Sequence, residues 1–503
     1  MRLLSAFERL LAEAKPAFAQ ERTFEHVRQF AYGFIAAWGR RTISRAICAC
    51  NAQFEDWSAS YRLFSRSPWE PNDVFQPILK SCLVYSPKEQ LLVVALDDTS
   101  LKKTGKRIPG VSYGRDPMSP PFHVNLRRGQ RYIQASAILR PEGLKGPARA
   151  IPIRFHPAPP PAKPGRKASE EELAAYKIAQ KTENLSRKAV ELIKGIRESV
   201  NKAECPGHTI LLAVDGSYCN GTVLRNLPEK TEVIARARGD VKLYLPPSVD
   251  GSGRGRRRKY GMELPKPKDI RSSDDYPWLE TPIFGAGRIH NLRHKVVPRV
   301  LWRSGTLTKP LRLIIIAPLG YRPTQKSRVL YRDPAYLLTT DLASPINTLI
   351  QAYFDRWEIE VNHRDEKSLL GVGQAQVWSK MATFRVPSFQ VAVYAMLLLA
   401  SLDAYGPKRT NNYLPLPKWR KQEERRPSTL DIIALLREEM FSLVVSKPLS
   451  IQKKNPTGEG NSASRLITMP SNSKASSRSK HTLNTTPENY PINLAAAMLY
   501  AST

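Results

Sequence analysis

The sequence contains little cysteine, no long apolar run and few acidic residues for its size. Its five cysteines, an odd number among 503 residues with no CxxC pair, provide neither a disulfide framework nor a zinc site. The most apolar stretch, 391–402, is only about a dozen residues long, whereas a membrane-spanning helix needs about 20. The first 15 residues carry acids and lack a small-residue cleavage site, so we interpret them as an amphipathic helix rather than a secretory signal. These absences predict a soluble, cytosolic protein without a membrane partner.

The deficit of acidic residues leaves the chain strongly basic. Lys and Arg total 78 against 45 Asp and Glu, a net charge of +33. Such a charge repels itself in the folded state, and a polyanion relieves the repulsion while each neutralised phosphate releases counterions. A functionally silent basic surface is one alternative. Membrane-surface binding is a weaker one, because the charge is not confined to one amphipathic helix. The charge therefore favours nucleic acid as the partner.

The pattern of apolar residues and charges divides the chain into five parts. Apolar residues at three- and four-residue spacing predict helices in the first part, and two buried-strand runs predict an α/β second part. Within the second part, the Pro- and Gly-rich stretch 141–167 predicts a loop, and 169–202 predicts one long helix. Between Gly251 and Pro310 there are 14 Lys or Arg and 5 Asp or Glu. The five parts are a helical N-terminal region (1–85), the first α/β part (86–240), a basic β-rich insertion (241–344), a region that completes the α/β part and adds C-terminal helices (345–445), and a polar tail that we expect to be disordered (446–503).

Two of the buried-strand runs end in an aspartate. LLVVALD delivers Asp97 and TILLAVD delivers Asp215, and a sheet would fix both carboxylates at its edge. Carboxylates are the hard oxygen ligands that Mg²⁺ prefers, and two-metal sites cleave phosphodiesters. An aspartate after a strand is also a common turn former or helix cap, so each residue taken alone has two interpretations. Asp98 follows Asp97 directly and, because strand side chains alternate, only one of the two can face a common site.

The segment YFDRWEIEVNHRDEK, Tyr353–Lys367, predicts a helix whose polar side chains sort onto separate faces. At 100° per residue, one arc of about 60° holds four of them: Tyr353, Arg356, Glu360 and Lys367. Trp357 flanks this arc, and the other four acids of the segment fall on the opposite side. The helical geometry therefore selects Glu360 as the acid that points with the arc. The alternative is a solvated helix stabilised by charge pairs four residues apart.

Together these motifs resemble a known family. The spacings of three, four and seven residues within the arc match the Y-R-E-K signature of a large group of bacterial insertion-sequence transposases in the DDE superfamily. In that group two acidic ligands follow buried strands, and these positions correspond to Asp97 in LDDTSLKKTGK and Asp215 in LLAVDGSYCNG. The family pattern favours Asp97 over Asp98. The resemblance covers the organisation of roughly residues 25–400, including RRTISRAI and DWSASYRLFSRSPW in the helical N-terminal region.

The resemblance implies a fold and an activity. The fold would be α/β, with a ribonuclease H-like catalytic core interrupted by the β-rich insertion and flanked by helical N-terminal and C-terminal regions. The activity would be that of a DNA transposase, which cleaves transposon ends and transfers the strands into target DNA in cut-and-paste transposition. Asp97, Asp215 and Glu360 would be the catalytic residues and would bind two Mg²⁺ or Mn²⁺ ions.

The resemblance also implies DNA contacts and partners. It assigns phosphate contacts near the transposon end to Tyr353, Arg356 and Lys367, which offer one hydrogen bond, a bidentate grip and a point charge. Trp357 either stacks on an unpaired base or packs against the core. The partners would be double-stranded DNA, as terminal inverted repeats and as target, and a second copy of the chain in a homodimer on DNA. The location would be the prokaryotic cytoplasm, in association with the nucleoid.

Other functions fit parts of the sequence. A catalytically inactive or domesticated sequence-specific DNA-binding protein would keep the fold, although the intact acids argue against it. A DNA nuclease without strand transfer would keep both the fold and the acids. A glycosidase would use paired carboxylates but would leave the net charge of +33 unexplained.

The histidines offer no competing site. His290 and His294 in HNLRH are four residues apart, but no third ligand is nearby and the surrounding sequence is basic. His363 falls outside the arc that contains Glu360, so we assign it no catalytic role.

Overall fold

The computed structural model describes residues 2–446, except 87–90, 106, 117–118, 121, 124, 144–145, 248–257, 286, 323–326 and 420–425. The polar tail expected over 446–503 therefore lies almost entirely outside the described residues. Four consecutive basic residues of the insertion, 256–259, lie partly outside them.

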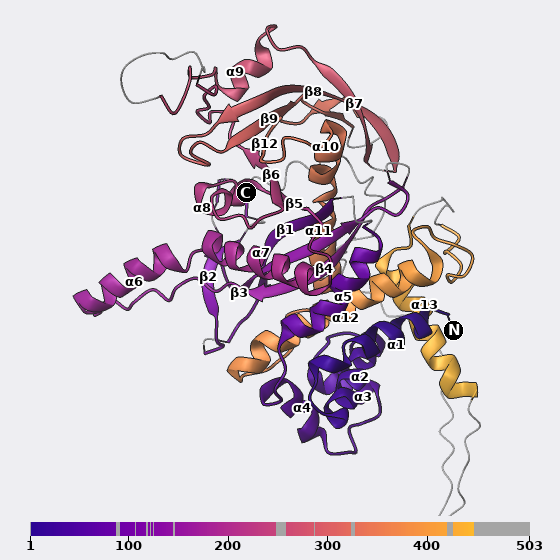
Figure 1. The fold of residues 1–503 in the computed structure, drawn as a ribbon. Coiled ribbons are helices and arrows are strands. Elements are labelled where there is room, and N and C mark those ends of the chain that lie inside the picture. Colours follow the sequence, from indigo (N-terminus) through magenta and orange to yellow (C-terminus); the bar gives the residue numbers. More distant parts are fainter. Residues whose placement is uncertain are drawn as a thin grey trace, which may run out of the picture.

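The chain begins with helices, as the apolar spacing predicts. In α1 the buried side chains recur at three- and four-residue intervals, from Leu3 to Phe7 and Leu11, and this stripe faces the core. These N-terminal helices pack around α12 and α13 (Figure 1, bottom). The elements are α1 (Arg2–Glu13), η1 (Lys15–Ala17), α2 (Glu21–Ala36), α3 (Ile43–Ala49), α4 (Trp57–Ser65), α5 (Pro71–Val84), α12 (Lys380–Tyr405) and α13 (Thr429–Ser446).

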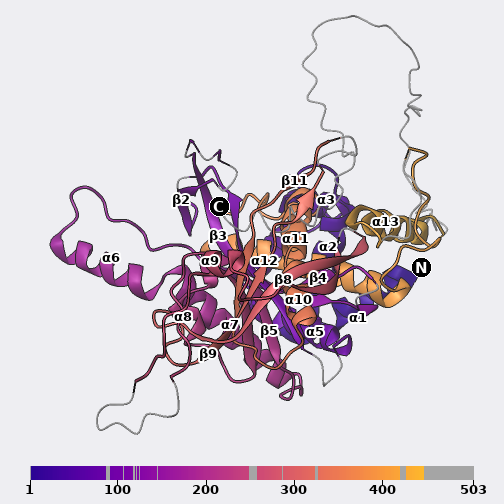
Figure 2. The same cartoon turned by 90° about the horizontal axis from the view of Figure 1, so that it is seen from above.

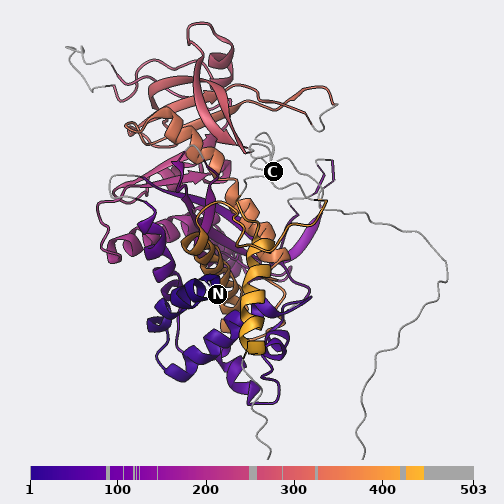
Figure 3. The same ribbon diagram turned by 90° about the vertical axis from the view of Figure 1, so that its right-hand side faces the viewer.

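The helix α12 is the only one among the described residues that is long and apolar enough to cross a membrane. By length and composition it passes that test, yet 94% of its most apolar window is buried inside the protein. Helices from both ends of the chain cover it (Figure 3). It is therefore placed as a core helix of the helical region.

A ten-stranded sheet forms the middle of the molecule. Its order is β2-β3-β1-β5-β6-β12-β9-β8-β7, and β4 pairs with β3 beside this path. The central strands β1, β5 and β6 run parallel, and all other pairs in the sheet are antiparallel. The strands are β1 (Leu92–Lys102), β2 (Val111–Arg115), β3 (Leu126–Leu139), β4 (Arg149–Pro157), β5 (Ile210–Val214), β6 (Thr231–Ala237), β7 (Leu279–Gly285), β8 (Arg288–Leu301), β9 (Pro310–Ile316) and β12 (Ala335–Thr339).

The basic insertion is β-rich and extends this sheet. Four of its strands, β7, β8, β9 and β12, join the sheet through the antiparallel pairing of β12 with β6. They lie at the top of Figure 1 together with α9 (Pro267–Ser272), opposite the N-terminal helices. A small separate hairpin is formed by β10 (Gly320–Tyr321) and β11 (Leu330–Tyr331). The predicted α/β fold is thus confirmed, and it is compatible with a ribonuclease H-like core.

Two expectations for the second part of the chain were wrong. The stretch 141–167 contains the strand β4, although its prolines predicted a loop. Proline is tolerated because β4 pairs only with β3, and Pro152 lies at a shift in register between them. The single helix expected over 169–202 is two helices, α6 (Glu170–Thr182) and α7 (Leu185–Lys202), because Asn184 caps the second one. No residue of α6 is buried, and it projects from the body (Figure 2).

The two faces of the central strands carry different helices. Because strand side chains alternate, Leu92 and Val94 of β1 pack with α7 and α12, whereas Ala95 packs with Ile359 on the other face. The same alternation in β5 sends Ala213 toward α10 (Ile346–Asp355). Residues at odd positions of β1 and β5 therefore face α10 and α11 (Glu358–Ser368).

A buried ion pair fixes the end of α10. Arg140, at the end of β3, donates from Nε and Nη2 to the two carboxylate oxygens of Asp355 at 2.5 and 2.9 Å. The two side chains are 14% and 8% exposed. We expect Arg140→Gln to lower the free energy of unfolding by about 3 kcal/mol, because it leaves a buried carboxylate without its cation.

Urea unfolding followed by circular dichroism would measure this loss. The control is Arg238→Gln, which removes an equally close but exposed ion pair with Asp240 and should change the stability little. Equal stabilities of the two variants would show that the Arg140–Asp355 pair does not hold α10.

Candidate active site

Asp97 and Asp215 lie side by side where the parallel pairing of β1 with β5 ends. The last pair is Leu96 opposite Val214, and one aspartate follows each of these residues. The expectation that both strands end at an aspartate was wrong for Asp97, because β1 continues to Lys102 through its antiparallel pairing with β3. Both aspartates occupy odd positions, and both therefore face α10 and α11. Asp215 also caps the short helix η3 (Gly216–Tyr218), where it accepts hydrogen bonds from the backbone and hydroxyl of Ser217 at 3.0 and 3.1 Å.

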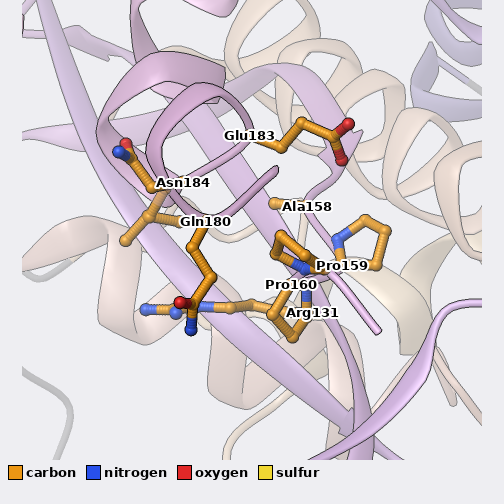
Figure 4. Close-up of a pocket in the computed structure, with 9 residues that line it drawn as sticks. Arg131, Ala158, Pro159, Pro160, Gln180, Glu183 and Asn184 are labelled. Carbon is orange, nitrogen blue, oxygen red and sulfur yellow. The ribbon is translucent and has the colours of Figure 1, made fainter. Parts of the chain in front are cut away.

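The neighbour Asp98 belongs to the opposite face. Its carboxylate accepts a hydrogen bond from Arg131 Nε at 2.7 Å. Arg131 in turn lines a hollow at the junction of α6 and α7, beside Pro159 and Gln180 (Figure 4). Of the two adjacent aspartates, Asp97 is therefore the one that lies with Asp215, and Asp98 has a structural partner of its own.

Glu360 approaches the aspartates from α11. The continuous helix expected over Tyr353–Lys367 was wrong, because α10 ends at Asp355 and α11 begins at Glu358. At the junction the backbone tightens: Trp357 N–H donates to the carbonyl three residues before it, and Glu360 N–H does the same. The helical direction continues through this turn, so Glu360 still shares a side with Arg356.

Arg356 lies among the three carboxylates. Its Nη1 is 4.0 Å from Asp97 Oδ2 and its Nη2 is 3.5 Å from Glu360 Oε1. Its side chain is 1% exposed, and Nε and Nη2 have no hydrogen-bond partner among the described residues. The guanidinium therefore acts on the carboxylates as a nearby charge rather than through aligned hydrogen bonds.

Burial and crowding of negative charge hold protons on this cluster. Burial raises the pKa of Asp215 to about 6, and the neighbouring charge of Asp97 adds to the shift. Burial raises the pKa of Glu360 to about 8; Arg356 opposes this shift, while Asp97 and Asp215 reinforce it. Burial also raises the pKa of Asp97, against the effect of Arg356. One guanidinium thus does not cancel the effect of desolvation on the pKa values of the three partly buried carboxyl groups, which is the electrostatic setting of a cation-binding site.

These pKa shifts predict a pH dependence of stability in the metal-free protein. A carboxyl group whose pKa is raised by folding contributes stability that is full below its pKa in the unfolded chain and is lost as the pH rises to its pKa in the folded protein. The free energy of unfolding should therefore fall as the pH rises from about 5 to about 8, by on the order of 2 kcal/mol. Glu360→Gln should remove the part of this fall that lies above about pH 6.

Urea unfolding in EDTA at several pH values would measure both slopes. Glu198→Gln, at an exposed position of α7, is the matched control and should keep the slope of the unchanged protein. Identical slopes for Glu360→Gln and the control would contradict the assignment of the high pKa to Glu360.

The three acids offer donor atoms that suit a divalent metal. In this structure, however, they are not arranged around a single ion position. Asp97, Asp215 and Glu360 offer only carboxylate oxygens, the ligands that Mg²⁺ prefers. Among the residues that the structure describes, no three acidic, His or Cys side chains stand close enough to hold one ion together. Arg356 lies between Asp97 and Glu360, so binding of a metal by all three acids requires this side chain to shift.

The other residues predicted to contact DNA lie around this cluster. Tyr353 is 3% exposed, and its hydroxyl has no hydrogen-bond partner among the described residues. Lys367 Nζ donates to Thr99 Oγ1 at 2.6 Å, two residues beyond Asp97 on β1. Trp357 is half-buried at the start of α11. The structure thus brings these residues to the carboxylates, whereas their contacts with DNA stay predictions.

The four other acidic residues in the segment 353–367 interact with protein groups rather than with solvent alone. Two are at the ends where α10 and α11 meet, and two lie in the last turns of α11. Their partners are Arg140 for Asp355, Arg426 for Glu358, Arg364 and Thr429 for Asp365, and Gln134 for Glu366. Glu360 is thus the acid of this segment whose neighbours are the aspartates and their guanidinium.

The structure adds Tyr218 to the site, a residue that the sequence analysis did not single out. It follows Asp215 by three residues, is fully buried, and its hydroxyl has no partner among the described residues. Burial raises its pKa well above the ordinary value, and the charges of Asp98, Asp97 and Asp215 add to this shift. Its position in the motif DGSY was the available signal.

The histidines do not form a metal pair within the described residues, and His294 is buried rather than facing solvent or DNA. His290 and His294 lie on the strand β8, where four residues span about 13 Å, too far to share an ion. His363 is buried beside Glu366, 3.6 Å from Nδ1 to Oε2.

The part of the chain that matches a known family includes β1, which carries Asp97, and β5, which Asp215 follows. Residues 15–309, more than half of the chain, match the family described as DDE superfamily endonuclease. The matched stretch ends before α10, so membership of the Y-R-E-K group stays a prediction. No curated protein matches the sequence. Membership of this family implies a nuclease-type enzyme that acts on DNA, which agrees with the net charge of +33 and with a pair of aspartates where the parallel pairing of two strands ends. The chain belongs to the DDE superfamily of endonucleases.

Proposed function

We propose that the chain is a DNA transposase of the Y-R-E-K group, which cuts DNA at transposon ends and joins the freed ends to target DNA. The observation that carries the proposal is the meeting of Asp97, Asp215 and Glu360 around Arg356 on one face of the sheet. Crowded, partly buried charge of this kind is costly for stability and indicates a functional reason. The other acids of α10 and α11 have structural partners, so the cost is concentrated at these three residues.

The reaction consists of two displacements at phosphorus. In the first, a water oxygen attacks the phosphodiester at the transposon end, the bond to the 3′ oxygen breaks, and that oxygen takes a proton to become a free 3′-hydroxyl. In the second, this hydroxyl attacks a phosphodiester of the target and displaces the 3′ oxygen there. Asp97, Asp215 and Glu360 would hold two Mg²⁺ or Mn²⁺ ions, which supply Lewis-acid stabilisation of the developing charge when bound.

The surrounding residues suit the binding of a phosphate. Arg356 has donor groups at Nε and Nη2 that no described residue uses, and guanidinium groups grip phosphates with two donors. Tyr353 has an unused hydroxyl beside it, with the ring centroid 5.9 Å from Arg356 Cζ. Lys367 adds a positive charge on the same side, and Trp357 offers an aromatic face for an unpaired base.

The proposal includes partners and a location. The substrates are the terminal inverted repeats of a mobile element and a target duplex, and two copies of the chain hold two ends as a homodimer on DNA. The reaction takes place in the prokaryotic cytoplasm, on DNA of the nucleoid. The five-part division of the chain, with an N-terminal DNA-binding region, belongs to the same proposal.

The test uses a plasmid that carries a marker between the two natural ends of the element, taken from the DNA that flanks the gene. Purified protein is incubated with this plasmid and a target plasmid in Mg²⁺, in Mn²⁺ and in EDTA. Excision of the marker and its insertion into the target, in metal only, would support the proposal. Cleavage without insertion would show a nuclease, and binding without cleavage would show an inactive DNA-binding protein.

A further inference from the structure

The helix that carries Glu360 is short and buries little apolar surface. α11 has 11 residues, and an isolated helix of this length is only marginally stable in water. Of the five side chains that α11 buries within the described residues, only Ile359 is apolar. The position of α11, and of Glu360 on it, therefore depends on polar contacts with the rest of the protein.

Two of these polar contacts come from one short segment, residues 426–429, which leads into α13. We call this segment the C-terminal strap. Arg426 Nη1 donates to a carboxylate oxygen of Glu358, the first residue of α11, and the two side chains are 19% and 16% exposed. Thr429 Oγ1 donates to Oδ2 of the buried Asp365 at 2.7 Å, in the last turns of α11. The strap therefore holds α11 near both of its ends.

The C-terminal strap is itself fixed to the body of the protein. The carbonyl of Pro427 accepts a hydrogen bond at 2.6 Å from Nη2 of Arg149, the first residue of β4. Ser428 and Asp431 close the start of α13 reciprocally: Ser428 N–H donates to Asp431 Oδ2 at 2.8 Å, and Asp431 N–H donates to Ser428 Oγ at 3.2 Å. A segment anchored to a strand and to a helix can hold α11 in place rather than follow its movements.

The strap and the aspartates act on opposite sides of α11. At 100° per residue, Glu358 and Asp365 differ by only about 20° around the helix and lie about 10 Å apart along it. Glu360 is about 140° to 200° away from both of them. The strap therefore supports α11 from the side away from the candidate active site, and Glu360 extends from the other side.

We propose that Arg426 and Thr429 are positioning residues of the candidate active site. By holding α11 from behind, they keep the carboxylate of Glu360 at its distance of 3.5 Å from Arg356 and within reach of a shared metal. Groups that orient metal ligands from outside the ligand set typically account for roughly 10- to 100-fold in metal affinity or activity. The strap and α11 lie beyond the stretch 15–309 that matches the family. The inference rests on the proposed function only for the binding of metal by Glu360.

The test compares Arg426→Gln/Thr429→Val with Arg62→Gln/Thr182→Val in the full-length chain. The second variant is the matched control, because it makes the same chemical changes at exposed positions of α4 and α6. In EDTA, hydrogen exchange followed by mass spectrometry should show the backbone amides of α11 exchanging roughly tenfold faster in the first variant only, while α7 and α12 stay protected. Isothermal titration should show that the first variant binds Mn²⁺ roughly tenfold more weakly than the control.

A conservative variant separates positioning from general damage. Arg426→Lys/Thr429→Ser keeps both donor groups and should recover most of the Mn²⁺ affinity. Thr429→Val alone removes a single hydroxyl and decides the question if circular dichroism shows the double variant unfolded. Unchanged exchange of α11, or faster exchange with unchanged Mn²⁺ affinity, would overturn the proposal. If the unchanged protein binds no Mn²⁺, the proposed function fails, and the exchange of α11 alone then decides whether the strap holds the helix.

Discussion

Glu360→Gln is expected to reduce metal-dependent DNA cleavage by about a thousandfold or more while leaving the protein folded. The substitution keeps the size of the side chain but removes an anionic ligand from a cluster that has only carboxylate donors. Charge stabilisation by a bound metal contributes several kcal/mol at the transition state, and each 1.4 kcal/mol corresponds to about tenfold in rate. Asp97→Asn and Asp215→Asn should cause losses of the same size.

The measurement is single-turnover cleavage of a labelled transposon end in Mg²⁺ and in Mn²⁺. Asp98→Asn is the matched control, because it makes the same chemical change one residue away, on the face where Arg131 holds the carboxylate. It should keep its rate within about tenfold. If Asp98→Asn abolished cleavage and Asp97→Asn did not, Asp98 rather than Asp97 would be the residue that faces the site.

The aspartates were predictable because the physics that places them is local. A buried-strand run fixes which side chains share a face, and parallel pairing of two such runs brings the residues that follow them side by side, even though β1 itself continues past Asp97 to Lys102. Glu360 was predictable for a similar reason, since a helix sorts its side chains by angle alone. The tightened turn at Arg356 and Trp357 changes that angle by only a few tens of degrees, which is too little to move Glu360 to the opposite side.

The rest of the site depends on contacts between distant parts of the chain. Asp355 and Glu366 have partners more than 200 residues away, Arg140 and Gln134, and no periodicity within the helix reveals them. The strand β4 was missed because proline content weighs against a strand, while its place beside a single neighbour is known only from the assembled sheet. Arg356 was expected at the DNA because its spacing matches a signature. That spacing holds no information on the burial of its side chain.

The burial of Arg356 leads to the second large effect. Arg356→Gln should make the metal-free protein less stable and at the same time tighten its binding of Mn²⁺ by roughly tenfold. In the unchanged protein the guanidinium compensates part of the charge of Asp97 and Glu360, at 4.0 and 3.5 Å. Unit charges at this separation interact by up to about 4 kcal/mol near a protein surface. We therefore expect the guanidinium to weaken the free energy of metal binding by about 1 to 2 kcal/mol. Removing the cation exposes the carboxylates to one another and leaves them freer to bind a metal.

Two readouts separate this effect from simple damage to the site. Isothermal titration with Mn²⁺ gives the affinity, and thermal unfolding in EDTA gives the stability; a merely disruptive substitution would lower both. Arg356→Lys keeps a positive charge and should fall between the unchanged protein and Arg356→Gln in both measurements. Cleavage by Arg356→Gln should still be lost, by about a hundredfold, because a phosphate loses its charge-assisted hydrogen bonds. Unchanged Mn²⁺ affinity in Arg356→Gln would mean that the guanidinium does not compete with the metal, and that it need not move for the metal to bind.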